Sequence, residues 1–147
     1  MIKFILKYKK VVFPIHPRAM KNFEKFDLGD TLKALQGLTL LEPQDYLSFQ
    51  QFVLYSAFVI TDSGGIQEET TYRKIPCLTL RPNTERPSTI EVGSNKLMKF
   101  DLEKIKDEIE SIEKGEFKNG QIPPLWDGKA TMRITDKIVE LFRADII

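Results

Sequence analysis

The stretch "FVITDSGGIQEE", residues 58–69, joins a short apolar run to two adjacent glycines and a polar segment of helical character. An apolar run rich in β-branched residues predicts a buried strand. Gly64 and Gly65 therefore fall in a turn between a strand and a helix. Two explanations fit such a turn. Glycine lets the chain turn tightly, and it also lets a phosphate approach the backbone because no Cβ is in the way.

The rest of the chain repeats this alternation of strand and helix. Further apolar runs occupy residues 11–15, 38–41, 76–80 and, more weakly, 96–100. Segments with helical character occupy residues 45–57, 65–74, 101–114 and 131–144. The polar segment between the last two helices, residues 114–129, predicts a loop. This order predicts an α/β fold in which right-handed crossovers connect the strands of a parallel sheet.

The composition is that of an ordinary globular protein. The length of 147 residues predicts one domain. The formal net charge of +1 predicts neither a nucleic-acid nor a membrane partner. No apolar run reaches spanning length and no signal-peptide pattern opens the chain, so a cytoplasmic location is expected. The single cysteine, Cys77, lies in an apolar run and is expected to be buried. No His, Cys and carboxylate cluster has metal-ligand spacing, and neither a metal nor a cofactor is expected.

The glycine turn has the chemistry of an anion site. In an open parallel sheet, ligands bind beyond the carboxyl ends of the strands. The first amides of a helix lack internal partners and the helix dipole favours anions there, so Gly64 and Gly65 suit a phosphate. Ser63 adds a hydroxyl donor. Glu68 or Glu69, in the first turns of the helix, is placed to accept hydrogen bonds from a ribose diol; the alternative is a favourable charge at a helix start.

A second stretch, "LRPNTERPSTIEVG" at residues 80–93, follows the next strand and reaches the same edge of the sheet. Arg81 and Arg86 offer two guanidinium groups, which suit a diphosphate. The alternative is a surface loop in which Arg86 pairs with Glu85 or Glu91. The glycine turn and the arginine loop lie at neighbouring strand ends. Together they favour a nucleoside diphosphate more strongly than either motif does by itself.

Two weaker candidates complete the site. In "LEPQDYLSF", residues 41–49, Gln44 could bond the edge of a base and Phe49 could pack on its face; the alternative is that this aromatic belongs to the core face of a helix. The single histidine, His16, ends the first strand beside Arg18. An anion contact and a structural role are both open for this pair.

Together these motifs resemble a known family. "FPIHPR", "LLEPQDYLSF", "ITDSGGIQEE", "TERPSTIEVGSNKL" and "DGKATMRI" are similar to the C-terminal part of UDP-N-acetylglucosamine 2-epimerases of the non-hydrolysing type, over about residues 10 to 143. The resemblance implies a Rossmann-like, three-layer parallel sheet that forms the C-terminal half of a glycosyltransferase-B type fold. It also implies an isomerase that converts UDP-GlcNAc to UDP-ManNAc by elimination and re-addition of UDP.

The resemblance also implies roles for the candidate residues. Gln44 and Phe49 would contact uracil. Ser63, Gly64 and Gly65 would hold the diphosphate. Further roles fall to Glu69 for the ribose hydroxyls, Arg86 for a phosphate, and His16 with Arg18 for a nucleotide or allosteric contact.

The chain departs from the family in length, since a full member is more than twice as long. We therefore expect residues 1–147 to form one partial nucleotide-binding domain, truncated at its N-terminus, with an inner strand and the N-terminal domain absent. No catalytic residue is expected in this half, which would be inactive alone. It would be either a fragment or a subunit that needs a separate N-terminal domain chain, and it would form a homo-oligomer. The alternatives are a non-catalytic module for UDP or a UDP-sugar, the nucleotide half of a glycosyltransferase of the same fold, and a hydrolysing epimerase. The "TERP" motif argues against the glycosyltransferase.

Overall fold

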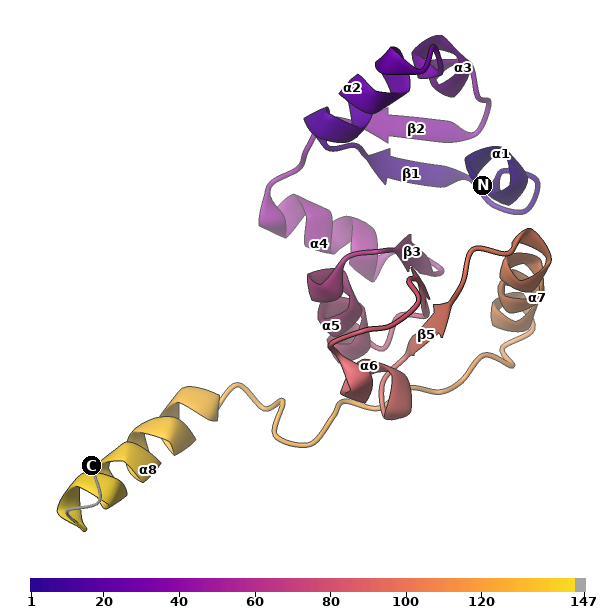
Figure 1. Cartoon of the computed structure of the whole chain (residues 1–147). Coiled ribbons are helices and arrows are strands. Elements are labelled where there is room, and N and C mark those ends of the chain that lie inside the picture. Colours follow the sequence, from indigo (N-terminus) through magenta and orange to yellow (C-terminus); the bar gives the residue numbers. More distant parts are fainter. Residues whose placement is uncertain (145–147) are drawn as a thin grey trace.

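The computed structural model describes residues 1–144, and in that range the strands form two parallel sheets (Figure 1). One sheet pairs β1 (Val11–Pro14) with β2 (Leu38–Leu41). The other has the order β3-β4-β5, with β3 at Val59–Thr61, β4 at Cys77–Leu80 and β5 at Asn95–Met98. Strands and helices alternate along the chain, which confirms the predicted α/β class.

The long helices lie where the sequence predicts them. They are α4 (Tyr46–Leu54), α5 (Gly64–Arg73), α7 (Leu102–Glu113) and α8 (Ala130–Arg143). The Asp45 carboxylate accepts a hydrogen bond from the Ser48 amide at 3.0 Å and begins α4. Asp101 caps α7 in the same way. Lys74 ends α5 in the left-handed conformation, with φ of 58°.

Four helices were not predicted: α1 (Ile2–Ile5), α2 (Pro17–Lys25), α3 (Gly29–Lys33) and α6 (Pro87–Glu91). The helices α1, α3 and α6 span five residues or fewer, which is too few to show a helical period. Both α2 and α6 begin with a proline at the first helical position, where its missing N–H costs nothing. The stretch 80–93, predicted as a loop, therefore contains a helical turn.

The prediction of one sheet was wrong, because β1 and β2 make no ladder with β3, β4 or β5 in the part of the chain that the structure describes. In Figure 1, β1 lies between β2 and the three-stranded sheet. The two sheets are connected instead through side chains. Val11 of β1 and Ile60 of β3 pack against one apolar cluster, whose buried members are Ile5, Ile105 and Ile109.

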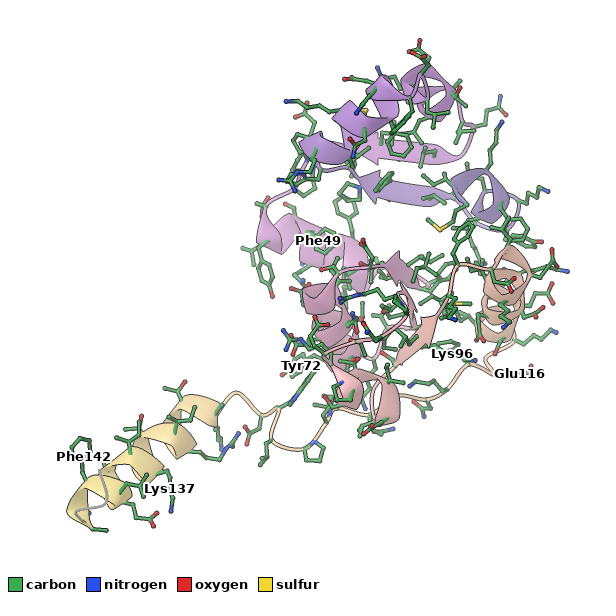
Figure 2. The ribbon with its side chains drawn as sticks, in the orientation of Figure 1. Phe49, Tyr72, Lys96, Glu116, Lys137 and Phe142 are labelled. Atoms are coloured by element: carbon green, nitrogen blue, oxygen red, sulfur yellow. The ribbon has the colours of Figure 1, made fainter. Side chains whose placement is uncertain are left out.

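Strand β4 is fully buried over residues 77–79, and helix α8 has no buried residue. Cys77, Leu78 and Thr79 of β4 have no exposed area, which confirms the expected burial of the cysteine. Helix α8 contains no buried residue and projects away from both sheets in Figure 1. Figure 2 shows Lys137 and Phe142 on this projecting helix. Among the described residues, no helix is long and apolar enough to cross a membrane.

Candidate functional site

The glycine turn lies at the carboxyl end of β3, as predicted. The strand ends at Thr61, and α5 begins at Gly64 after Ser63. The Thr61 hydroxyl accepts the Ser63 amide at 3.0 Å and shapes the turn. The Ser63 side chain forms no capping hydrogen bond within residues 1–144, so its hydroxyl is available to a ligand. A Cβ built on Gly65 would meet no atom within 4 Å, which leaves open space beside this first turn of the helix.

Arg86 lies across from this turn, at the start of α6. Its Nε is 3.4 Å from Oε2 of Glu68, on the first turns of α5. This ion pair is not a hydrogen bond, and the shielded Nε has no hydrogen-bond partner among the described residues. The predicted alternative, a pair of Arg86 with Glu85 or Glu91, was wrong because the fold brings α5 and α6 together. Arg86 thus keeps donors that its own chain does not use.

Glu85, next to Arg86, occupies part of the space at the helix start. A Cβ on Gly64 would come within 2.5 Å of Oε1 of Glu85, so this carboxylate lies against the glycine. Arg81 holds it from the other side through an ion pair of 3.0 Å. Its own backbone amide, and then Arg81 and Arg86, lower the pKa of Glu85 and keep it charged. The Glu85 carboxylate therefore lies beside the turn at which an anion was predicted to bind.

Glu69 is held by residues that the sequence analysis did not identify. Its Oε2 accepts a hydrogen bond from Nε2 of Gln50 at 2.5 Å, and Oε1 of Gln50 accepts one from Nε of Arg73 at 2.8 Å. Gln50 is only 4% exposed although it is polar. A buried glutamine on the apolar face of α4 was the available signal, because buried amides need partners. With Gln50 and Arg73 in place, Glu69 is oriented with its second oxygen uncommitted.

An open pocket of about 370 Å³ lies around Glu69, between α4 and α5. This volume is in the range of small-molecule sites. Its walls combine two carboxylates with aromatic rings, which can respectively accept hydrogen bonds from hydroxyls and stack on a flat group. The lining residues are Tyr46, Gln50, Glu68, Glu69, Tyr72, Arg73 and Trp126.

The remaining candidates do not line this pocket. Gln44 is exposed and donates to the carbonyl of Glu42 at 2.7 Å, and Phe49 is half-buried on α4 (Figure 2). The exposed His16 begins α2, where its Nδ1 accepts the amide of Arg18 at 3.2 Å. The structure therefore gives His16 a structural role as a helix cap. Within residues 1–144 no group of three or more His, Cys, Asp or Glu side chains is arranged to hold a metal ion.

Comparison with known proteins relates this chain to a family. The family model described as UDP-N-acetylglucosamine 2-epimerase matches residues 1–139. The UDP-N-acetylglucosamine 2-epimerase of Methanocaldococcus jannaschii is 41% identical over 128 residues, which are 86% of this chain and 34% of that protein. The enzyme of the same name from Methanococcus maripaludis is 43% identical over 107 residues, 72% of this chain and 29% of that protein. The chain thus spans about a third of the length of these curated relatives.

Solved structures give the same result. The UDP-GlcNAc 2-epimerase of Methanocaldococcus jannaschii superimposes with a TM-score of 0.76 at 38% identity, over 94% of this chain and 38% of that one. The structure of that enzyme in complex with UDP-GlcNAc and UDP gives a TM-score of 0.75, with the same identity and coverage. These similarities confirm the resemblance and the Rossmann-like α/β fold that it implies.

Proposed function

Because the chain belongs to the UDP-N-acetylglucosamine 2-epimerase family, we propose that it forms the nucleotide-binding part of a UDP-sugar site. The ligand is a UDP-sugar, UDP-GlcNAc, held at the carboxyl ends of β3 and β4. The proposal treats residues 1–147 as a single, partial nucleotide-binding domain. A relative solved with UDP-GlcNAc and UDP supports the choice of ligand.

One observation supports the diphosphate position most directly: Nε of Arg86 is shielded, has no hydrogen-bond partner within residues 1–144 and lies 3.4 Å from Glu68 on the first turns of α5. A guanidinium presents five N–H donors in a fork that matches a phosphate. Ser63 adds a free hydroxyl, and Gly64 and Gly65 add helix-start amides without a Cβ. These groups converge on the turn where a diphosphate would replace the Glu85 carboxylate.

The nucleoside would lie in the pocket around Glu69, whose lining includes Glu68, the ion-pair partner of Arg86. There the free oxygen of Glu69 accepts the ribose hydroxyls, while Gln50 holds its other oxygen at 2.5 Å. Contacts of uracil with Gln44 and Phe49, and of an anion with His16 and Arg18, stay predictions. Both Gln44 and His16 are exposed and use their polar atoms within their own segments.

The test is a calorimetric titration of UDP into the purified chain. We expect binding, and we expect Arg86→Ala and Glu69→Ala each to weaken it about tenfold, because hydrogen bonds to charged groups contribute about 1.5–3 kcal/mol. Arg133→Ala is the matched control. Arg133 also forms an ion pair with a carboxylate, Asp127 at 2.9 Å, but it lies on α8.

Three results would contradict all or part of the site. Absence of UDP binding by the wild-type chain would mean that these residues do not form a nucleotide site by themselves. Equal weakening in Arg133→Ala and Arg86→Ala would mean that the effect is one of net charge. Binding of UDP with no weakening in Glu69→Ala would remove the ribose role and leave the diphosphate role in place.

For the whole reaction, we propose that residues 1–147 supply nucleotide binding and that epimerisation of UDP-GlcNAc to UDP-ManNAc needs a further domain. The chain's coverage of about a third of the relatives supports this division. We also propose that the chain self-associates, since Met132, Ile134 and Phe142 of α8 are each about 60% exposed. Epimerisation by the purified chain, followed by NMR, would contradict the first proposal, and a monomer in light scattering would contradict the second.

A further inference from the structure

A buried polar network lies beneath the proposed diphosphate site. It consists of four side chains with no exposed area, Gln67, Thr79, Thr89 and Asn95, together with the half-buried Thr84. They come from α5, β4, α6, β5 and the loop that carries Arg86. Burial of polar groups is unfavourable unless every group is paired, so this network needs an explanation.

Gln67 connects the network to the glycine turn. Its Nε2 donates to the backbone carbonyl of Ser63 at 3.3 Å. Its Oε1 accepts from the Thr84 hydroxyl at 2.7 Å and from Nδ2 of Asn95 at 3.1 Å. One carboxamide therefore contacts the helix start, the loop and the far strand of the sheet at the same time.

The other end of the network holds the backbone of Arg86 on both sides. The backbone amide of Arg86 donates to Oγ1 of Thr84 at 3.1 Å. Its carbonyl accepts from Oγ1 of Thr89 at 2.7 Å, and that hydroxyl accepts in turn from Nδ2 of Asn95 at 3.1 Å. Both peptide groups that flank the Arg86 side chain are thus bonded to threonines, and these threonines are bonded to Gln67 and Asn95.

The orientation of Asn95 is settled by a further bond. Its Oδ1 accepts from the Thr79 hydroxyl at 2.7 Å, so its Nδ2 must face Gln67 and Thr89. Each buried side-chain N or O atom of the network has at least one hydrogen-bond partner. Such a network favours one arrangement, because a shift leaves a buried group unpaired.

We propose that Gln67, Thr84, Thr89 and Asn95 are positioning residues that fix Arg86 relative to the Ser63–Gly65 turn. This inference rests on the proposed function, since it assigns the two positioned groups to one diphosphate. A diphosphate needs its donors on opposite sides at a set separation, and preorganised donors do not have to be ordered when the ligand binds. The network sets that separation through side chains that never touch the ligand.

The test uses Thr84, the member at the edge of the network, because its replacement leaves the buried amides of Gln67 and Asn95 in contact. Thr84→Val removes the hydroxyl and keeps the shape, while Thr84→Ser keeps the hydroxyl. Thr70→Val is the matched control. Thr70 is fully buried, and its hydroxyl bonds the backbone carbonyls of Ile66 at 2.7 Å and Gln67 at 3.2 Å within its own helix, but none of the side chains of the network.

Two readouts are taken for each variant beside its melting temperature: UDP affinity by calorimetry and amide hydrogen exchange of Arg86 by NMR in the free protein. Thr84→Val should weaken UDP binding and speed exchange of the Arg86 amide, each by about fivefold, as expected for one lost hydrogen bond. Thr84→Ser should restore both values. Thr70→Val should lower the melting temperature without changing either readout.

The outcomes separate this inference from the proposed function. If the wild-type chain does not bind UDP, the proposed function fails, and the Arg86 exchange rate still decides whether the network holds this loop. If Thr84→Val lowers the melting temperature but leaves both UDP affinity and Arg86 exchange at wild-type values, the network is only structural and the inference is overturned. Failure of Thr84→Ser to restore them would overturn it as well.

Discussion

The two sheets of this chain differ in how their strands are covered. In the three-stranded sheet, β4 has a partner on each edge, and its residues 77–79 have no exposed area. In the two-stranded sheet each strand has one partner, and burial falls accordingly: the second residue of each strand, Val12 and Thr39, is exposed and the others are half-buried. A pair of strands is marginal by itself, whereas a third strand gives the middle one two neighbours and a dry environment.

This difference extends to the functional groups. The buried hydrogen bond between Gln67 and Asn95 connects α5 to β5 of the three-stranded sheet. The loop of Arg86 is bonded to the same network through Thr84. Neither β1 nor β2 contributes a residue to the pocket around Glu69. Accurate placement of polar side chains thus coincides with complete burial, because a polar group in a dry environment has few acceptable orientations.

The largest expected effect tests this contrast in burial directly. Leu78→Ala in β4 should lower the free energy of unfolding by about 2–5 kcal/mol, the usual range for a leucine in a packed core. Leu40→Ala in the half-buried β2 should cost about 1 kcal/mol, because less apolar area leaves water there. Urea unfolding of both variants measures the difference. Equal losses would mean that the two sheets are packed equally well.

A second prediction concerns the segment that leads to α8 and its contact with the three-stranded unit. Gly120 has no room for a side chain, since a Cβ there would overlap the backbone of Gly93 and Ser94. Gly120→Ala should therefore destabilise the chain by about 1–3 kcal/mol, as overpacking does. Gly65→Ala, where the space is open, is the control and should be neutral for stability. A neutral Gly120→Ala, measured in the same urea series, would show that this segment moves aside freely.

The smallest effect is a pH dependence from the thiol in β4. Burial raises the pKa of Cys77. The unfolded chain then loses the thiol proton before the folded chain does, so stability is complete below about pH 8.5, the ordinary thiol pKa, and falls as the pH rises through the native pKa. The fall is at most about 1.4 kcal/mol per pH unit. Urea unfolding from pH 7.5 to 10 should show it in the wild type and show less of it in Cys77→Ala; identical pH profiles would contradict burial as the cause.

Much of the fold followed from local patterns. The five strands were predicted from short apolar runs, and α4, α5, α7 and α8 from the helical spacing of their apolar residues; Asp45 also supplied a recognisable helix start. Short helices such as α6, with five residues, do not show a period. An inner strand was expected to be absent, but the division into a two-stranded and a three-stranded sheet was not predicted, because strand pairing depends on which edges meet in space.

The same distinction between neighbouring and distant residues applies to the site. Ser63, Gly64, Gly65 and Glu69 stand within seven residues of one another, so their chemistry could be recognised as one motif. The residues that orient them lie far away along the chain. Gln50 bonds Glu69 across 19 residues and Asn95 bonds Gln67 across 28, and the sequence shows them only as polar residues in apolar surroundings.

By itself, then, the sequence determined the α/β class, the glycine turn at the end of a strand and membership of the UDP-N-acetylglucosamine 2-epimerase family. These properties depend on residues near one another in the chain, where spacing is information enough. Only the tertiary structure decided that the sheet is divided, that Arg86 pairs with Glu68 instead of its neighbours, and that Gln67 and Asn95 hold the loop of Arg86. The physical reason is that hydrogen bonds and ion pairs act over a few ångströms of space, and only packing brings distant segments within that range.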